Sequence, residues 1–419
     1  MKHSLIRIRI LTGMLALVTA LSFSFVDIAV AFADDEPIVE EPAIEQIEEQ
    51  SDGLESDAIE EPIVDPEPQM PIIETPSRGL VGAISSNTGW YFAEDGIILA
   101  NVREIAKQGP TSYNVLQGSC SNGGKYFYFA FMKKATEKVK IIKMKWSNGE
   151  LKYSKSSGCI NNYHGNGMTY VKDVNGKDKI LITNAWSGHT NHISVLDVQT
   201  MKLESDIICS YWNDLSQCEM IYADGTPVEN QQKTLAKLIK SRGKRGFSGI
   251  AYDQKSKRLA VTTCTQHDLI VFDLSVNSKG RIVLTPRKFI IEQKPSGVIQ
   301  DIDCDENYIY VVWNSGGNKI CVYDWNGNNV NNLLADNSYE MEGLFHTGEG
   351  NSAQFYATYH HSYKYNKVTY TKKKVKWKKV WNKKHTKKVW KYKTKKVKKI
   401  TTYIYRNGYL RNLGNLTTA

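Results

Sequence analysis

The hydrophobic pattern between residues 79 and 363 is a repeat of short strands. In each repeat a first apolar strand, a turn and a second apolar strand follow one another, and four of the five repeats continue into a third strand. The repeats start at Gly118, Gly167, Gly249, Asp301 and Gly343, at intervals of 49, 82, 52 and 42 residues. A period of about 40–50 residues with about four strands per unit is typical of the blades of a β-propeller.

We therefore predict an all-β fold, a five-bladed β-propeller that spans residues 79–363. The last repeat runs out of sequence after its second strand, at residues 355–358, so other strands must complete it. Residues 89–92 and 97–100 are placed to supply them, which would close the ring with N- and C-terminal strands. Closure removes the exposed sheet edge that an open array carries. The alternative is a β-sandwich or a solenoid, although a solenoid has a shorter period.

The long second interval contains an insertion at residues 213–245. Within it, Leu235, Leu238 and Ile239 share one face of residues 229–240, and Gly243 follows, which predicts a short amphipathic helix. Loops added to one face of a propeller often carry its specificity. A helix that only caps the barrel mouth is the alternative, and the sequence leaves both open.

The first 78 residues differ from the repeats in composition. Residues 1–33 combine a charged start, an apolar run and the ending Ala31-Phe32-Ala33, which predicts a cleaved secretory signal, with an uncleaved membrane anchor as the alternative. Residues 34–78 hold 16 acidic residues against one basic residue and contain repeated prolines, which predicts a disordered linker. No later stretch reaches the roughly 18 apolar residues that a membrane span requires. We expect a secreted monomer, extracellular or associated with the cell wall.

Residues 364–419 are strongly cationic, with 18 lysines, two arginines and no acidic residue. Valine, tryptophan and tyrosine alternate with the lysines, which predicts a β-rich tail of short strands with one cationic face. Residues 403–410 predict a hairpin that turns at Asn407-Gly408. Dense lysine attracts polyanions, and aromatic rings suit membrane interfaces or sugars. The candidate envelope-binding residues are Lys373, Trp377, Trp381, Lys388, Trp390 and Tyr392.

Several partners fit this cationic tail. For an exported protein they are anionic cell-wall polymers such as teichoic acids, anionic lipid, or extracellular nucleic acid held by nonspecific phosphate attraction. We expect a cell-wall polymer or a membrane surface, and no specific nucleic acid. Two further interpretations stay open: the acidic linker neutralises the tail within the chain, or the tail is solvated and has no partner.

A polar residue precedes the start of each repeat, where the first strand of a blade lines the central channel. The channel-lining candidates are Gln117, Asn166, Ser248, Gln300 and Glu342. Calcium accepts oxygen ligands that include carboxylates. Calcium is therefore the candidate cofactor, with Glu342, Asn166 and Asp301 as its candidate ligands. We favour a water-filled channel whose polar groups are hydrogen-bonded, with the calcium site and a small-molecule or catalytic site as the alternatives.

Two histidines are expected at the rim of the channel, His164 before one repeat start and His346 after another. Histidine titrates near neutral pH and can act as a general base. No nucleophile or paired carboxylate accompanies them at an interpretable spacing, so no catalytic residue is assigned and a binding protein is favoured over an enzyme. The seven cysteines cannot all pair within one chain, and Cys209 with Cys218 is the pairing we favour.

Residues at three repeat starts resemble the helveticin J-like family of secreted, class III bacteriocin-type proteins of Gram-positive bacteria. These residues are Gln117-Gly118, His164-Gly165-Asn166-Gly167-Met168-Thr169-Tyr170 and Glu342-Gly343. The similarity covers residues 115–362. It implies a propeller, export and, in some members, killing of related bacteria without a known enzymatic activity. The acidic linker and the cationic tail lie outside the family pattern and equally suit an envelope-bound protein of the producing cell.

A weaker resemblance, carried by Glu342 and Asn166, is to gluconolactonase-type propellers, whose channel metal is held by Glu and Asn or Asp side chains. It implies a calcium-dependent hydrolase or lactonase with its site in the channel. The sequence thus supports two hypotheses of different class: a binding protein attached to the envelope by its cationic tail, and a metal-dependent hydrolase.

Overall fold

The computed structural model describes residues 89–418, apart from 93–96, 108–112, 134, 162–163, 185–191, 210–214, 243–245, 264–266, 293–296, 315–316 and 335–338. The predicted signal (1–33) and linker (34–78) lie outside the described residues. The described chain forms two compact units, one of residues 363–405 and the other of residues 89–362 with 406–418.

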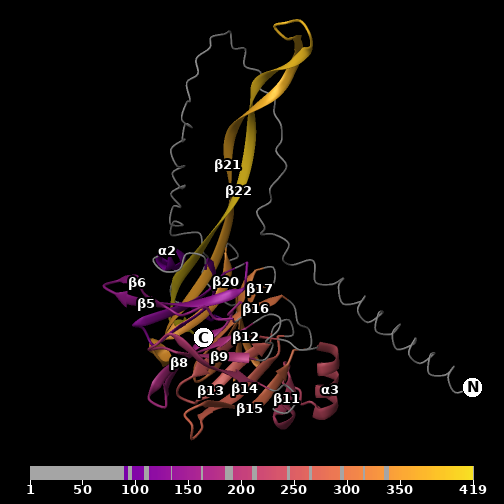
Figure 1. The fold of residues 1–419 in the computed structure, drawn as a ribbon. Coiled ribbons are helices and arrows are strands. Elements are labelled where there is room, and N and C mark those ends of the chain that lie inside the picture. The colour runs from indigo at the N-terminus through magenta and orange to yellow at the C-terminus, as the bar shows by residue number, and fades with distance from the viewer. Residues whose placement is uncertain are drawn as a thin grey trace, which may run out of the picture. The chain divides into compact units, whose positions relative to one another are not determined.

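Five sheets build the larger unit, and their strands follow one another as in propeller blades (Figure 1). The first blade holds β3 (Val115–Ser121), β4 (Tyr126–Lys133), β5 (Lys138–Ser147) and β6 (Glu150–Ser156). The second holds β7 (Met168–Val174), β8 (Lys177–Thr183), β9 (His192–Asp197) and β10 (Lys202–Ile208). The fourth holds β16 (Val298–Cys304), β17 (Tyr308–Asn314), β18 (Asn318–Asp324) and β19 (Asn329–Leu334). The predicted five-bladed β-propeller is confirmed.

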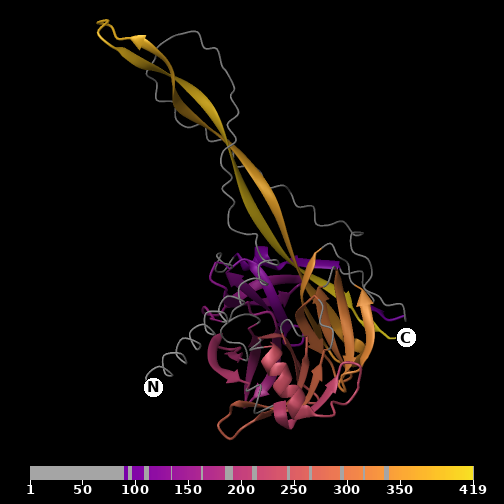
Figure 2. The same cartoon turned by 90° about the vertical axis from the view of Figure 1, so that its right-hand side faces the viewer.

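The third blade gains a fifth strand from the insertion. Its antiparallel strands are β12 (Phe247–Asp253), β13 (Arg258–Thr263), β14 (Leu269–Val276) and β15 (Ile282–Ile291). After a 3₁₀ turn, η1 (Leu215–Gln217), β11 (Glu219–Tyr222) pairs in parallel with β15 as the outermost strand. The expected helix is α3 (Gln231–Arg242), and its Leu235 is buried in the same apolar cluster as Met220 of β11. The insertion therefore covers the outer edge of this blade (Figure 2).

The fifth blade draws strands from both ends of the chain. From the inside outward it holds β20 (Glu340–Thr347), the start of β21 (Gln354–Trp381), the end of β22 (Lys388–Gly414) and β2 (Ile97–Asn101). A 3₁₀ turn, η2 (Gly350–Ser352), lies between β20 and β21, and α2 (Val102–Ala106) follows β2. Residues 97–101 thus supply an outer strand, whereas β1 (Tyr91–Phe92) pairs separately with β23 (Leu416–Thr417).

This topology corrects the boundary of the predicted tail. The chain leaves the fifth blade along β21 and returns at Arg406 to form the third strand of the same blade. The predicted turn at Asn407-Gly408 is wrong, because both residues lie inside β22. Gly408 is needed for packing, since a Cβ there would lie 2.9 Å from Cδ2 of Leu116. The cationic segment is therefore an insertion within a blade.

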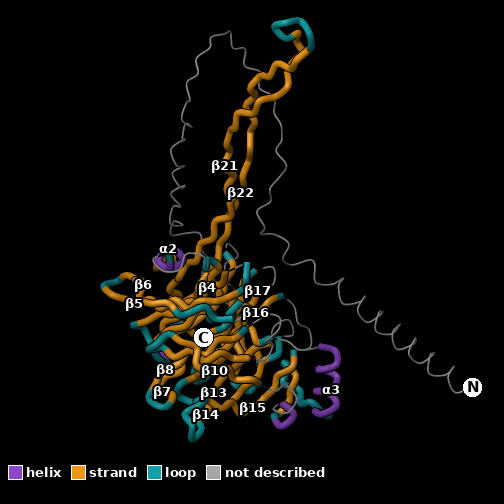
Figure 3. Tube along the Cα trace, in the orientation of Figure 1, coloured by secondary structure: helices purple, strands orange, loops and turns teal. Residues whose placement is uncertain are grey.

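Apolar faces of neighbouring blades pack against each other and form the core. Phe127 and Phe129 of the first blade lie in one cluster with Phe345 and Leu410 of the fifth, so packing joins the first blade to the last. Figure 3 shows strands through most of the described chain, with helices confined to short segments. Among the described residues no helix has the length and apolar character that crossing a membrane requires.

Residues 363–405 are the middle parts of β21 and β22, joined by a turn, and we call them the lysine hairpin. The backbone N–H of Asn382 donates to the carbonyl of Lys387 at 2.9 Å and closes the turn. Further along, Thr402 Oγ1 donates to Asn366 Oδ1 at 2.7 Å across the two strands. No side chain described between residues 366 and 402 is buried. The predicted short strands are two long ones, and they have no core of their own.

Candidate functional site

The repeat starts meet at the axis of the propeller, where the inner strands approach closely. A Cβ on Gly118 would lie 2.5 Å from the carbonyl oxygen of Asn166, and one on Gly167 would lie 2.7 Å from Cα of Gly249. Glycine is required at such positions because no side chain fits. The channel is closed at this level, which we call the waist. The waist consists of Gly118, Gly167, Gly249, Asp301 and Gly343.

Asp301 takes the waist position that is glycine in the other four blades. Its side chain is fully buried, and Oδ1 accepts a hydrogen bond from the N–H of Ile302 at 2.8 Å. Burial raises the pKa of Asp301 well above its usual value, although the backbone N–H groups of Ile302, Ser119 and Ile250 favour the carboxylate. These three groups belong to the fourth, first and third blades, so Asp301 connects blades across the axis.

Polar groups lie on one side of the waist, which we call the Glu340 mouth; Gln300 and Glu342 are buried there, and Glu340 is exposed. Gln300 Nε2 donates to Glu340 Oε1 at 2.7 Å, and Asn314 Nδ2 donates to the same oxygen at 3.2 Å. Burial raises the pKa of Glu342 well above its usual value, and the nearby Glu340 and Asp301 raise it further. The structure thus brings Gln300 and Glu342 together with Glu340, which the sequence analysis did not name.

The other predicted channel residues are also buried, but two of them bond within their own blades. Gln117 Nε2 donates to the carbonyl of Leu116 at 2.7 Å, and Ser248 Oγ lies 3.0 Å from Thr262 Oγ1. Asn166 Oδ1 has no hydrogen-bond partner among the described residues. A single ring of five converging side chains therefore stays a prediction.

Of the predicted calcium ligands, Asp301 belongs to the waist, and Asn166 and Glu342 each directly precede a waist residue in the sequence. Within the described ranges, no group of three or more His, Cys, Asp and Glu side chains is arranged to hold a metal ion. The carboxyl groups of Glu342 and Asp301 are fully buried, and both have raised pKa values. A bound cation would favour their charged forms, so this donor set fits calcium in chemistry but lacks a third carboxylate.

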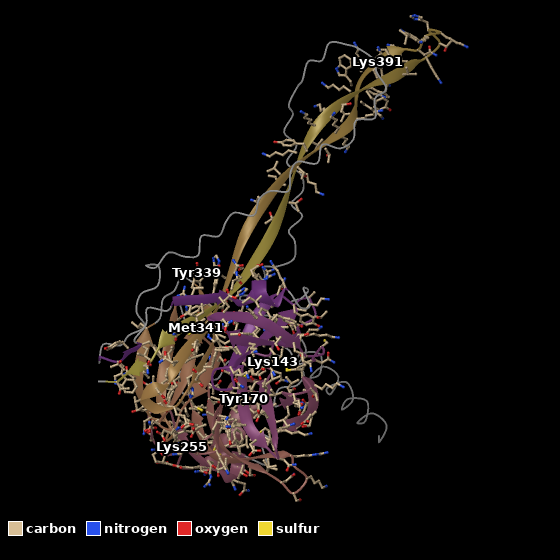
Figure 4. All side chains as sticks on the ribbon, turned by 90° about the vertical axis from the view of Figure 1, so that its left-hand side faces the viewer. Lys143, Tyr170, Lys255, Tyr339, Met341 and Lys391 are labelled. Atoms are coloured by element: carbon tan, nitrogen blue, oxygen red, sulfur yellow. The ribbon has the colours of Figure 1, made fainter. Side chains whose placement is uncertain are left out.

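On the opposite side of the waist the blades enclose a cavity of about 460 Å³, which we call the His346 mouth. It is lined by the ends of the inner strands and the turns that follow them, including Cys120, Tyr170, Tyr252, Asp303 and His346. In Figure 4 the cavity-lining Lys255 lies toward one end of the propeller and Tyr339 toward the other, with the cavity-lining Tyr170 between them. Cavities of this size hold small molecules in many proteins.

The most perturbed polar pair in this cavity is His346 with Asp303. Nδ1 of His346 lies 2.8 Å from Oδ2 of Asp303, and the imidazole packs against the ring of Phe355. Burial lowers the pKa of His346, but Asp303, Asp305 and Asp253 raise it, and the result is a pKa of about 9. The imidazole is therefore protonated at neutral pH. It can donate a hydrogen bond or a proton, but it is a poor general base.

Two further carboxylates of the cavity hold its turns. Asp305 Oδ1 accepts the N–H groups of Asn307 and Tyr308 at 2.7 and 2.8 Å, and its Oδ2 accepts the hydroxyl of Tyr310 at 2.7 Å. Asp253 accepts the N–H of Ser256 at 2.9 Å in the equivalent turn. The sequence analysis missed these residues, although an acidic residue directly after an inner strand is the signal of such a turn.

The two predicted rim histidines lie in different surroundings. His346 lines the cavity, whereas His164 precedes the waist, and its Nε2 lies 3.7 Å from Oε1 of Glu137. His164 has a positive φ of 66°, so its backbone forms the loop that leads into β7. His346 thus lines the cavity, and the place of His164 at the channel rim stays a prediction.

The lysine hairpin carries the second candidate site. All six predicted envelope-binding side chains, Lys373, Trp377, Trp381, Lys388, Trp390 and Tyr392, are exposed there. The Nζ atoms of Lys379 and Lys376 lie 5.2 and 5.6 Å from the ring centre of Trp390, and that of Lys388 lies 5.5 Å from the ring centre of Trp381. Lysines and aromatic rings therefore form one continuous, solvated surface.

No protein-family model and no curated protein sequence matches the chain. Among solved structures, a protein from Lactobacillus plantarum is similar with a TM-score of 0.34 and 10% identity, and the match covers 59% of this chain and 64% of that protein. The calcium-binding protein regucalcin from Agrobacterium tumefaciens has a TM-score of 0.31 and 10% identity, and the match covers 64% of this chain and 85% of regucalcin. A protein from Bacteroides uniformis, provisionally assigned as a 6-phosphogluconolactonase, has a TM-score of 0.33 and 10% identity, and the match covers 66% of this chain and 77% of that protein.

Proposed function

We propose that this chain is a secreted β-propeller binding protein whose lysine hairpin attaches it to the anionic polymers or membrane of a cell envelope. The observation that carries the proposal is the hairpin itself: 18 lysines without an acidic residue, interleaved with exposed tryptophan and tyrosine. Clustered lysines attract polyanions, and exposed rings add contact with sugars or lipid headgroups. Export is inferred from the signal-like composition of residues 1–33.

A bacteriocin-like role is the form of this proposal that the helveticin J-like resemblance suggests. The residues that carry this resemblance have structural roles in the propeller. Gly167 belongs to the waist, and Thr169 Oγ1 accepts the N–H of Tyr252 from the next blade at 3.0 Å. Growth inhibition of related Gram-positive bacteria by the purified protein would support killing. Full growth together with retained wall binding would favour an envelope-associated protein of the producing cell.

Binding to isolated Gram-positive cell walls tests the proposal. In the variant, an Asn-Gly turn replaces residues 363–405, which joins the two blade strands directly. We expect the full chain to sediment with the walls and to be released as salt rises, because exposed charges are screened. We expect the variant to stay in solution while keeping its propeller. Equal sedimentation of both proteins would contradict the proposal.

A second candidate function, a hydrolase or lactonase acting on the propeller axis, is favoured by the cavity at the His346 mouth. There the protonated His346, oriented by Asp303, would donate a hydrogen bond to the carbonyl of a bound substrate. Calcium at Glu342, Asn166 and Asp301 would stabilise the axis. A rise in melting temperature with calcium that is absent in Glu342→Gln, together with turnover of a lactone, would support this candidate. A melting temperature of the wild type that does not change with calcium would count against a calcium site in this candidate.

A further inference from the structure

Lysines line both faces of the lysine hairpin. Side chains alternate between the two faces of a strand, so even and odd positions of β21 project to opposite sides. Even positions carry Lys372, Lys374, Lys376 and Lys378, and odd positions carry Lys373 and Lys379. In β22, even positions carry Lys388, Lys396 and Lys398, and odd positions carry Lys393, Lys395 and Lys399, so the lysines of this strand also project to both sides.

Aromatic side chains are also distributed over both faces. Tyr370 lies at an even position and Trp377 at an odd one, and they are 58% and 52% exposed. Figure 4 shows side chains projecting from both sides of the hairpin ribbon, with Lys391 labelled among them. Neither face is apolar, so the hairpin is not amphipathic in the way that a segment lying in a membrane interface is.

From this arrangement we propose that the ligand of the lysine hairpin is a linear phosphate-bearing polymer bound along both faces, and not a lipid surface. The inference rests on the proposed function and narrows its ligand. A bilayer contacts one face of the hairpin and leaves the charges of the other without a counterpart. A flexible chain with repeated phosphates can neutralise both.

The cationic side chains of the hairpin are all lysines, which suit a flexible polyanion because they bind through charge and not through a fixed geometry. All 18 cationic side chains of residues 363–405 are lysines, and the first arginine is Arg406, inside the blade. The guanidinium fork of arginine pairs with carboxylates and phosphates in a fixed bidentate geometry, whereas a lysine ammonium is a point charge on a flexible stem that binds phosphate without a fixed orientation. The exposed rings between the lysines can stack on the sugar, polyol or base units that separate successive phosphates.

Polymer binding and ordering of the hairpin are coupled. A two-stranded hairpin alone is marginally stable in water, and neighbouring lysines of one face repel each other. The cation–π contacts of Lys378 with Trp377 and of Lys379 with Trp390 are solvent-exposed, where such contacts stabilise only weakly. A polyanion removes the repulsion and adds contacts on both sides, so the bound hairpin is more ordered than the free one.

Two matched variants of the full chain test the inference. The even-face variant changes Lys388, Lys396 and Lys398 of β22 to glutamine, and the odd-face variant changes Lys393, Lys395 and Lys399 of the same strand. Tryptophan fluorescence is titrated over a salt series with poly(glycerol phosphate), oligodeoxythymidylate, polyglutamate of similar length, and phosphatidylglycerol vesicles. We expect both variants to lose similar affinity for the phosphate polymers. The slope of log K against log salt should fall by about 2 in each, because three phosphate contacts at roughly 0.7 each are removed.

The four probes separate the outcomes. Tighter binding of poly(glycerol phosphate) than of oligodeoxythymidylate assigns the polymer to the cell wall, and the reverse assigns it to nucleic acid; both support the inference. Equal binding of polyglutamate overturns the phosphate class. A preference for vesicles, with loss in one variant only, overturns the two-faced mode but leaves the proposed function standing. Failure of the wild type to bind any polyanion contradicts the proposed function as well.

Discussion

The same two strands, β21 and β22, have opposite surroundings in the fifth blade and in the lysine hairpin. In the blade, Phe355, Ala357 and Tyr359 are each at most 2% exposed and pack between neighbouring blades. In the hairpin, Trp377 and Trp381 are each 52% exposed. The alternating pattern that favours a strand is similar in both parts. Burial by neighbouring sheets, and not strand propensity, therefore distinguishes a folded blade from a solvated hairpin.

Charged side chains also differ between the two regions in whether they have partners of opposite charge within the chain. In the propeller the buried Lys179 lies 2.9 Å from Asp197 and 2.8 Å from Glu204, so its charge is matched within one blade. The hairpin sequence contains no acidic residue at all. The propeller is therefore stabilised by its own contacts, whereas the hairpin depends on solvent ions or on an anionic partner.

Removing the hairpin should have the largest effect. With residues 363–405 replaced by an Asn-Gly turn, we expect the affinity for poly(glycerol phosphate) to fall at least about 100-fold, because every lysine of the hairpin is lost. The melting temperature should change by no more than about 2 °C, since none of the side chains described between residues 366 and 402 is buried. Fluorescence titration and calorimetry measure the two effects. A large drop in melting temperature would mean that the two regions are not independent.

A substitution in the waist should show that the stability of the propeller depends on close packing there. In Gly167→Ala the new Cβ would meet the backbone at Gly249 at 2.7 Å, so we expect a loss of about 3 kcal/mol in the free energy of unfolding. Gly158→Ala is the matched control, because nothing lies within 4 Å of its Cβ. Denaturant unfolding monitors both, and equal stability of the two variants would contradict a closed waist.

Raising the pH should weaken the propeller through His346. Its pKa is raised in the folded state from 6.5 to about 9, so the stabilisation is complete below pH 6.5 and is lost as the pH rises toward 9. The loss should be roughly 3 kcal/mol, and it should be absent in His346→Gln. Unfolding measured across this pH range, with the variant as control, tests the prediction. An identical pH dependence in both proteins would show that Asp303 does not hold the imidazolium.

Asp301→Asn should have the smallest effect. Burial favours the protonated carboxyl of Asp301, and asparagine is a neutral side chain of the same shape, so we expect a change within about 1 kcal/mol. Asp301→Ala should cost more, because the group that connects three blades is lost. If Asp301→Asn destabilised the propeller as much as Asp301→Ala, the axis would depend on a charged carboxylate.

The sequence predicts the propeller well because its repeat reflects a physical requirement at the waist. Gly118, Gly167, Gly249 and Gly343 recur because the strands meet there, and apolar strands follow because blades pack face to face. The same reasoning fails at Asn407-Gly408. That pair is a strong turn signal, yet its glycine accommodates the side chain of Leu116 from another blade. A local pattern cannot distinguish a turn from a close tertiary contact.

The candidate sites were predictable to different degrees. The six hairpin residues are exposed because no other sheet covers them, and composition alone indicates this. His346 was named from its position, but its partner Asp303 belongs to the preceding repeat, and only the ring of blades brings the two to 2.8 Å. The cavity was not predicted, because its walls come from turns of all five blades, far apart in the sequence.

Hydrogen exchange of backbone amides tests the contrast between the two regions most directly. In the free full-length protein, we predict that amides of residues 366–402 exchange at least about 100-fold faster than those of Ala357 and Leu410, although all lie in the same two strands. Addition of poly(glycerol phosphate) should slow amide exchange in the hairpin and leave exchange in the blade unchanged. Equal protection of both regions in the free protein, or no change on adding the polymer, would contradict the account.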